Sequence, residues 1–592
     1  MRLLVVIFIS VLCHVPLRAQ KAALAENYFD QGQYDKALII YQRLVENQPR
    51  QPKYVLGLVK TYQQLSQFSE AERLLKSRLG ETRVYPLYYI ALGDNFNKQR
   101  LVDSAQRYID RGVQFAFQQP NYTISIGKAL TDLSLLNDAK NLYTGVMERH
   151  RDKDYRLQLA RVYGELGDLA PMFETYLSLM ETTPRFIPSI KRYLETYVTT
   201  DKDNSGNVLL KNALLNRLSQ NQDPLYNDLL SWLFVQQREY AKAFIQQKAI
   251  YLRLGNNLQS LRNLAHAAHL DQQSAMAKTI YEYVLSVAAD PRIQLSVSLE
   301  ILSIERASAI LSMDQIDSAY QKLLDDFPQL DQTQLILDYS EFLAFELGAS
   351  QRAISQLNQA AETATKPFSQ GRFRLLLGDI LVFNERYNEA LVNYALVQSA
   401  LKNDDLAQAA KFKEAQTSYF RGDFDWAQTQ LKILKSSTSQ KMANDAIALH
   451  VLINENTLED TTQLALKKYA AAELLIHQKQ YKKAVTALKE LQNDPKLDRL
   501  ADDVLHTLGQ TSLAIGQTDA AKNYWQNLID NYPESVHLDD ALFELATLMI
   551  QVYNDPQTAK TYLENIIFNH PDSIYFVAAQ NQYRQLRGDQ IN

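Results

Sequence analysis

The first part of the chain repeats one helical pattern at a fixed spacing. Alanine stands at positions 37, 71, 105 and 139, so each follows the last by 34 residues. A large apolar residue follows each alanine four positions later, which places the two side chains on one helical face. A period of this length predicts stacked helical units, with alanine where two helix axes come closest.

The same pattern continues through the chain with longer connections. Ala243 and Ala277 are again 34 residues apart, whereas the intervals between Ala484, Ala521 and Ala559 are 37 and 38. We therefore predict that one set of alanines packs the repeats together: Ala37, Ala71, Ala105, Ala139, Ala243, Ala277, Ala319, Ala353, Ala390, Ala427, Ala484, Ala521 and Ala559. In a less regular fifth unit, Met172 takes the place of the alanine.

Interruptions of the pattern predict the organisation of the chain. The period is lost over 186–225, which contains a polar stretch at 199–207, and again over 436–465. We expect a signal peptide at 1–19, repeat arrays at 20–185, 226–435 and 466–572, irregular joints at 186–225 and 436–465, and a capping helix and tail at 573–592. In the last helix, Phe576, Val577, Ala579 and Tyr583 are expected to form the packing stripe, and Gly588 to end it.

These residues resemble a known repeat. The first unit carries Tyr28, Gly32, Tyr34, Ala37, Tyr41 and Pro49, and the third carries Leu92, Gly93, Phe96, Ala105 and Ile109. The pattern resembles the tetratricopeptide repeat, a helix-turn-helix unit of 34 residues. The resemblance implies an all-α fold, an α-solenoid or superhelix of such repeats.

The last repeats have long connections that contain proline, at 532–535 and 570–573. These connections are similar to those of cell-envelope repeat proteins, such as the outer-membrane barrel-assembly lipoprotein and the periplasmic repeat protein of the Tol-Pal system. The segment from Tyr419 to Arg587 also resembles long exported repeat proteins of the Bacteroidetes.

The N-terminus predicts export. Arg2 precedes an apolar run, Leu3 to Leu12, and Ala19 offers a small residue for cleavage. The run is too short for a permanent membrane span, and no later stretch is long and apolar enough. A retained anchor is one alternative, and lipidation at Cys13 is another, although Leu12 stands where lipoprotein signals carry a small residue. We expect an exported protein in the periplasm, peripheral to the outer membrane.

Composition excludes several function classes. Cys13 is the one cysteine, so the mature chain is expected to have no disulfide, thiol nucleophile or cysteine-bound metal. Loss of Arg2 and Arg18 with the signal leaves 60 of the 62 Lys and Arg against 67 Asp and Glu, a net charge of −7. A mildly acidic chain without a basic tract argues against nucleic-acid binding.

The sequence predicts no catalytic residue, cofactor or metal. The phosphate-binding pattern GxxxxGK[ST] and the zinc pattern HExxH are absent. His266 and His269 share a helical face but would need a third ligand, so we interpret them as partly exposed histidines of a repeat helix. Two acids, Asp502 and Asp503, precede His506, and we interpret them as helix caps with an i,i+4 contact. Capping also explains the paired acids Asp325–Asp326, Asp404–Asp405 and Asp539–Asp540.

The inner helices of such a solenoid predict a binding groove. Some tetratricopeptide domains hold a C-terminal carboxylate with Lys and Asn, but here the corresponding charges alternate. The groove candidates are Lys53, Lys60, Asp94, Asn97, Lys128, Asp132, Tyr419 and Phe420.

The sequence therefore favours a non-catalytic scaffold for other proteins, components of envelope assembly or secretion. The alternative is a carbohydrate-binding accessory protein, in which Tyr419, Phe420, Phe424 and Trp426 stack on sugars. The pattern indicates no oligomeric state.

Overall fold

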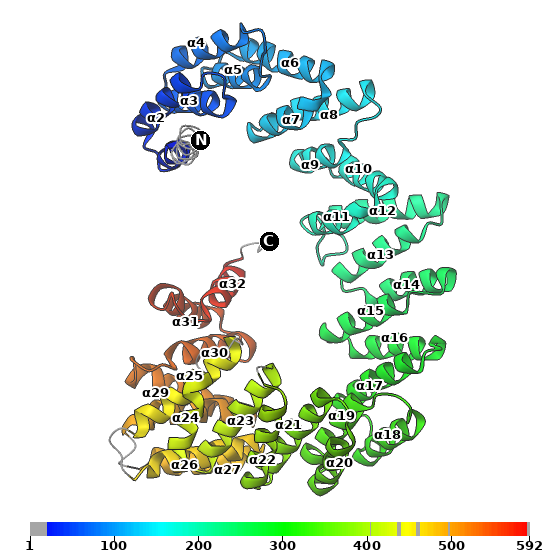
Figure 1. The fold of residues 1–592 in the computed structure, drawn as a ribbon, viewed down its shortest axis with the longest axis vertical. Helices are drawn as coiled ribbons and strands as arrows, with labels where there is room; N and C mark the ends of the chain where they lie inside the picture. The colour runs from blue at the N-terminus through cyan, green and yellow to red at the C-terminus, as the bar shows by residue number, and fades with distance from the viewer. Residues whose placement is uncertain (1–20, 403, 435–439, 458–461, 495–497, 589–592) are drawn as a thin grey trace, which may run out of the picture. The chain divides into compact units, whose positions relative to one another are not determined.

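The structure, a computed structural model, describes residues 21–402, 404–434, 440–457, 462–494 and 498–588 (Figure 1). Throughout these ranges the regular secondary structure is helical, with no strand. The predicted signal peptide, including Cys13, lies outside them. The chain divides into two compact units, one ending at Ala277 and the other beginning at Lys278, and each is described by itself.

The first unit begins with a helix over residues 21–30. It continues with α2 (Tyr34–Asn47), α3 (Pro52–Gln64), α4 (Phe68–Leu79), α5 (Leu87–Lys98), α6 (Val102–Gln118), η1 (Pro120–Tyr122), α7 (Thr123–Asp132), α8 (Leu136–Arg149), α9 (Arg156–Leu166), α10 (Leu169–Thr182), η2 (Pro184–Phe186), α11 (Ile187–Leu194), α12 (Ser205–Gln220), α13 (Pro224–Gln236), α14 (Tyr240–Leu254) and α15 (Leu258–Leu270). The boundary between the units falls within α16 (Ser274–Val287).

The second unit contains α17 (Pro291–Ala307), α18 (Met313–Asp326), α19 (Thr333–Phe345), α20 (Ser350–Thr363), α21 (Pro367–Phe383), α22 (Tyr387–Ala400), α23 (Asp405–Phe420), α24 (Phe424–Leu434), α25 (Gln440–Thr457), α26 (Leu464–His477), α27 (Tyr481–Gln492), η3 (Asp498–Leu500), α28 (Ala501–Ala514), α29 (Thr518–Asn531), α30 (Leu538–Gln551), α31 (Pro556–Asn569) and α32 (Phe576–Arg587).

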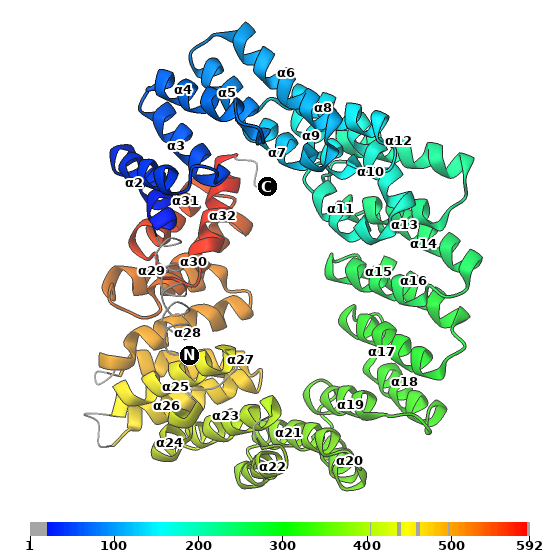
Figure 2. The same ribbon diagram turned by 45° about the horizontal axis from the view of Figure 1, so that its top comes forward.

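Most consecutive helices pack against each other, and the first helices of several neighbouring hairpins also pack together. This second contact joins α3 to α5 and α5 to α7 in the first unit, and α19 to α21 and α21 to α23 in the second. Within each unit, Figures 1 and 2 show the hairpins laid one against the next. The predicted fold class is therefore confirmed: an all-α solenoid of helix-turn-helix repeats.

The alanines of the repeat are packed in the interior. All of those named above are fully buried except Ala319, which is only partly buried. In α18 the buried positions are Ile316 and Tyr320. Ile316 is the fourth residue of its helix, as Ala427 is in α24, so it is Ile316 that occupies the packing position in this repeat.

In four hairpins, a glycine in the first helix receives the large side chain that follows the alanine. The two partners are 16 residues apart in Gly93 and Ile109, Gly127 and Tyr143, Gly378 and Tyr394, and Gly509 and Trp525. A Cβ on any of these glycines would lie 2.1–2.7 Å from its partner's side chain. The hairpin therefore needs a small residue on one helix and a large one on the other.

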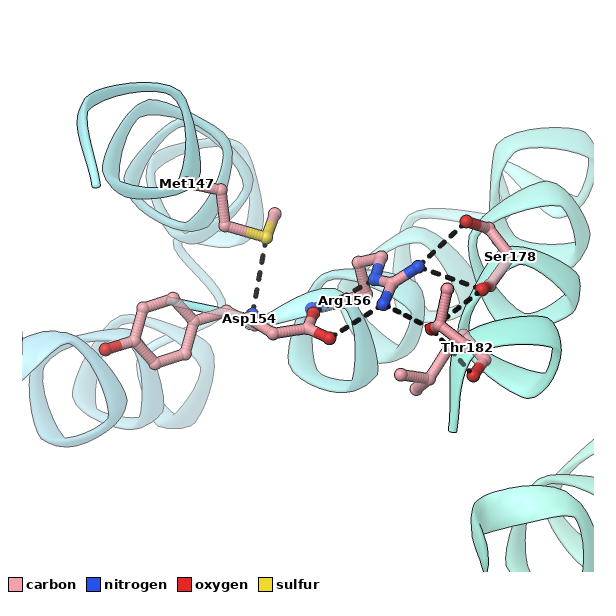
Figure 3. A network of polar contacts seen from close by, with 7 residues as sticks. Met147, Asp154, Arg156, Ser178 and Thr182 are labelled. Carbon is pink, nitrogen blue, oxygen red and sulfur yellow. Dashed lines mark hydrogen bonds and ion pairs between the residues drawn. The ribbon is translucent and has the colours of Figure 1, made fainter. Parts of the chain in front are cut away.

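Polar contacts of Arg156 join two helices near the end of the array predicted at 20–185 (Figure 3). Nη1 of Arg156 donates to the carbonyl and hydroxyl oxygens of Ser178, both at 2.9 Å. Nη2 donates to Thr182 Oγ1 at 2.7 Å and to Asp154 Oδ2 at 2.8 Å. The backbone N–H of Tyr155 donates to Met147 Sδ at 3.3 Å, so the start of α9 is fixed to both α8 and α10.

The region after this array remains helical. It contains η2, α11 and α12, with a turn between the two α-helices. The polar stretch at 199–207 is a loop only as far as Asn204. This residue caps α12 by accepting a hydrogen bond from the N–H of Gly206.

The C-terminal helix α32 has a narrower buried face than predicted. Gly588 ends it with φ of +89°, as expected, and Ala579 is buried. Val577, however, is 65% exposed, so it does not belong to the packing stripe. Among the described residues, none of the helices combines the length and apolar character that a membrane span requires.

Candidate functional site

The second unit carries a groove of about 750 Å³ on its inner helices. We call it the C-terminal groove; it is formed by α23, α25, α26, α28 and the beginning of α30. Its acidic lining residues are Asp445, Glu455, Glu473, Asp503 and Asp540, and its histidines are His477, His506 and His537. No lysine or arginine is among the described residues that line it, so the groove is acidic.

Helical spacing brings these side chains together. Tyr469, Glu473 and Ile476 are four and three residues apart and lie along one face of α26. Asp503, His506 and Gln510 have matching spacing on α28. The two faces line the same groove, and the hydroxyl of Tyr469 on α26 contacts Thr507 on α28, so the faces form one surface.

Glu473 is the acid most affected by the groove. Burial raises its pKa to about 7, and Asp503 contributes to the rise, although a hydrogen bond from the hydroxyl of Tyr419 opposes it. The hydroxyl of Tyr469 lies 2.7 Å from Thr507 Oγ1 beside it. A partly buried carboxyl with this pKa changes charge near neutral pH.

His537 lies between two carboxylates from different helices. Its Nε2 is 3.0 Å from Asp503 Oδ1, and its Nδ1 is 3.6 Å from Asp540 Oδ2. Burial opposes the charged form of His537, but the hydrogen bonds and charges of the two acids outweigh it and raise the pKa to about 10. The ring stacks on that of His506, with centroids 4.4 Å apart and planes inclined by 6°.

This geometry corrects the interpretation of the acids before His506. Asp503 does not cap α28, because the N-cap residue of this helix is Leu500 and no side chain caps it. The partner of Asp503 is instead His537, 34 residues later. Asp540 likewise accepts a hydrogen bond from the hydroxyl of Tyr575, at 2.8 Å, instead of capping α30. Asp404 does cap its helix, α23, by accepting from the N–H of Leu406.

The first unit has a smaller groove, of about 420 Å³, on the helix at 21–30, α3, α5 and α7. We call it the N-terminal groove. Four predicted groove residues line it: Lys53, Lys60, Asp94 and Asp132. Lys53 forms an ion pair with Glu26 at 3.0 Å, so its charge is already compensated. Asn97 and Lys128 do not line the groove, and the side chain of Lys128 is exposed elsewhere on α7.

The aromatic residues proposed for sugar stacking do not form one flat surface. Tyr419 and Phe424 are buried in the core, although Tyr419 reaches the C-terminal groove with its hydroxyl. Phe420 is partly buried and lines that groove. Trp426 is half exposed and donates from Nε1 to Glu414 Oε1 at 3.2 Å.

The two histidines considered for metal binding lie away from both grooves. His266 is exposed on α15, and His269 Nδ1 is 3.1 Å from Ser274 Oγ. Sequence reasoning missed His537 altogether, because it stands in a connection before α30. The available signal was the interval of 37 residues between Asp503 and Asp540, which marks equivalent positions in successive repeats.

Residues 23–50 and 503–535 match the family described as tetratricopeptide repeat. One matched segment lies in each unit, so each unit contains a stretch that is similar to this family. The second segment includes the residues of α28 that line the C-terminal groove.

Among curated proteins, the human Protein O-mannosyl-transferase TMTC1 is 24% identical over 182 residues, which cover 30% of this chain and 20% of that protein. The chain thus spans about a fifth of the length of this relative. Two solved structures align over nearly the whole chain at 11% identity. They are Naa15/Naa10 bound to HypK-THB, with a TM-score of 0.31 and coverage of 97% and 94%, and the APC/C hetero-tetramer Cut9-Hcn1, with 0.23 and 98% of each chain.

Proposed function

We propose that this protein is a non-catalytic scaffold that holds a segment of another protein in its C-terminal groove. The observation that supports the proposal is the acidic groove on stacked helices, which is lined by both polar and apolar side chains. Phe420, Ile476 and Val536 supply apolar contact area in it. The partner that fits is an extended or helical segment with basic and apolar side chains.

The proposal includes export to the periplasm, peripheral to the outer membrane, and partners in envelope assembly or secretion. The support is the charge and hydropathy pattern of residues 1–19 and the resemblance of the last repeats to envelope proteins. N-terminal sequencing of the protein recovered from the periplasm tests it. We expect the mature chain to begin at Gln20 and to be recovered without detergent; an acylated or uncleaved chain would contradict the proposal.

Groove binding is tested by affinity capture with matched variants. Gln510 is exposed on α28 and lines the groove, so Gln510→Trp should block it. Gln551 is exposed at the end of α30 outside the groove, so Gln551→Trp is the control. We expect the partner captured by the wild type to be lost with Gln510→Trp and kept with Gln551→Trp. Equal capture by both variants would reject the groove, and saturable binding to a glycan array with no captured protein would favour the carbohydrate alternative.

A further inference from the structure

We propose that the C-terminal groove binds a lysine side chain of the partner segment and holds its ammonium group with Glu473, Asp503 and His506. The inference rests on the proposed scaffold function and names the residue type that the groove recognises. All three side chains line the groove, Glu473 from α26 and the other two from one face of α28. The site therefore needs these two helices to be packed in one array.

The acids of the groove are not balanced by cations. Three of them interact electrostatically with one and the same cationic group, the imidazolium of His537. These acids are Glu473, Asp503 and Asp540, and no lysine or arginine is among the described residues that line the groove. A cation from a partner would improve this balance, and an ion pair in a partly desolvated groove is stronger than one at the open surface.

Two of the carboxylates each have one oxygen left for such a cation. The hydroxyl of Tyr419 donates to Oε2 of Glu473, whereas Oε1 has no partner among the described residues and is not one of the fully buried atoms. Asp503 uses Oδ1 for the contact with His537, at 3.0 Å, which leaves Oδ2. Because both acids line the groove, a cation within it can reach these oxygens.

His506 provides an independent observation that points to a ligand. Its side chain is 7% exposed, and its Nδ1 has no hydrogen-bond partner among the described residues. Burial, together with the charge of His537, lowers the pKa of His506 to about 4, so the ring is neutral and has a lone pair that can accept a hydrogen bond. A donor that enters the groove would give this buried side chain a partner.

The arrangement of these acceptors selects lysine over other cations. One metal ion could not lie in the ring planes of both His506 and His537, because the rings are stacked with planes inclined by 6°. Arginine binds a carboxylate best through two oxygens at once, but Glu473 and Asp503 each have one oxygen occupied. An ammonium group has three donors that point in different directions, which suits single acceptor atoms from two helices.

The groove also accommodates the rest of a lysine side chain. Its partly buried apolar residues include Phe412 and Phe420 on α23, and Leu449 and Leu452 on α25. The methylene groups of lysine can lie on such a surface while the ammonium group reaches the acids. The groove volume of about 750 Å³ exceeds that of one side chain, so neighbouring residues of a segment also fit, which favours a protein ligand over a free amine.

The experiment selects binders for the full chain from a random peptide library displayed on phage. Peptides that also bind Gln510→Trp, the variant with the blocked groove, are discarded. We expect lysine to be enriched at one position of the remaining peptides. The enrichment should be lost with Glu473→Gln as the target. It should be kept with Glu490→Gln, which removes the same charge at an exposed position of α27 outside the groove.

Calorimetry with the best selected peptide measures the contribution of the ammonium group. Norleucine in place of the lysine should weaken binding to the wild type at least about tenfold at pH 8, and arginine should weaken it several-fold. The loss with norleucine should be much smaller in Glu473→Gln. Circular dichroism checks that each variant is folded, and Asp503→Asn, which should also reduce the preference for lysine, decides the matter if Glu473→Gln does not fold.

A change of pH supplies a second readout. Because Glu473 has a pKa of about 7 without ligand, the advantage of lysine over norleucine should be smaller at pH 5.5 than at pH 8. In Glu473→Gln this dependence should disappear, which separates Glu473 from the other ionisable groups nearby. These are Tyr419 on α23, His477 on α26, Asp503 and His506 on α28, and His537 and Asp540 at the beginning of α30.

Three outcomes would overturn the proposal. Groove-dependent peptides without enriched lysine, or with an enrichment that survives in Glu473→Gln, would reject the lysine site and leave the scaffold function standing. A library that yields no groove-dependent peptide would reject both. Cadaverine, a free diamine, is the last comparison: if it binds the wild type more tightly than the selected peptide does, the ligand is a small amine and not a protein segment.

Discussion

At the scale of single residues, Asp503 and Asp540 show how position decides chemistry. Both are partly buried acids at equivalent places in successive repeats, and burial favours the neutral form of each. Asp540 accepts a hydrogen bond from Tyr575 and forms an ion pair with His537, so its pKa falls below the usual value. Asp503 has His537 alone as a donor and stands beside Asp502, and its pKa remains raised.

Glu473 gives a prediction about pH. Its pKa is about 7 in the folded chain and near the usual 4.5 in the unfolded chain, so the folded state binds the proton more tightly. The stability that this group contributes is full below pH 4.5 and is lost as pH rises to 7. We expect Glu473→Gln to be about 1–3 kcal/mol more stable than wild type at pH 8 and equal to it below pH 4.5. Urea unfolding at both pH values measures this; a difference that does not depend on pH would contradict it.

Gly378 gives a prediction about packing. In Gly378→Ala, the new Cβ would lie 2.4 Å from the ring of Tyr394, which is fully buried. Alanine favours a helix by about 1 kcal/mol, but overpacking costs about 1–3 kcal/mol, so we expect net destabilisation. Gly80→Ala is the control, because its Cβ would meet only ordinary contacts at 3.5 Å or more. Thermal unfolding that is unchanged by Gly378→Ala would show that the ring moves freely.

At the scale of helices, hydrogen bonds between side chains and helix ends supplement apolar packing. Arg156 uses its planar fork to reach α10 and Asp154, two positions before its own helix begins, at the same time (Figure 3). A lysine at this position would offer one ammonium group and lose part of the set. The contact therefore fixes the start of α9 in a way that helix propensity does not.

We expect Arg156→Ala to destabilise α9 and α10 by about 1–3 kcal/mol, with Arg156→Lys between it and the wild type. Hydrogen exchange of the amides in these two helices is the measurement. Arg151→Ala, at an exposed position in the preceding turn, should leave their protection unchanged. Equal losses in Arg151→Ala and Arg156→Ala would show that the effect is one of charge and not of these hydrogen bonds.

At the scale of the whole molecule, stability is expected to be local. Repeats contact mainly their neighbours, so a substitution in one array should change the stability of that array and have little effect on more distant repeats. Gly127 and Gly378 occupy the same position of the hairpin in different units. They therefore offer a matched test of how far cooperativity extends.

We expect Gly127→Ala to lower hydrogen-exchange protection around α7 and α8, and Gly378→Ala around α21 and α22. The effects should add within about 0.5 kcal/mol in the double variant, because the sites share no partner. Loss of protection in both units from either single change would instead show that the chain unfolds as one cooperative body.

The sequence by itself determined the helical repeats. The interval of about 34 residues and the pairing of Ala37 with Tyr41, or Ala390 with Tyr394, are local properties of a helical face, so they predict helices and their packing side. The sequence predicted Ala319 as the packing residue of α18, whereas the structure has Ile316 there. Both residues suit the same helix, and only the contacts with neighbouring helices distinguish them.

Only the tertiary structure decided which polar residues share a groove. Lys53 and Lys60 line the N-terminal groove while Lys128 does not, although all three stand on inner helices, because a groove depends on the rotation of each helix about its axis. His506 and His537 are 31 residues apart, in a helix and a connection, and no local pattern links them. They meet because the connection before α30 lies against α28, the first helix of the preceding repeat.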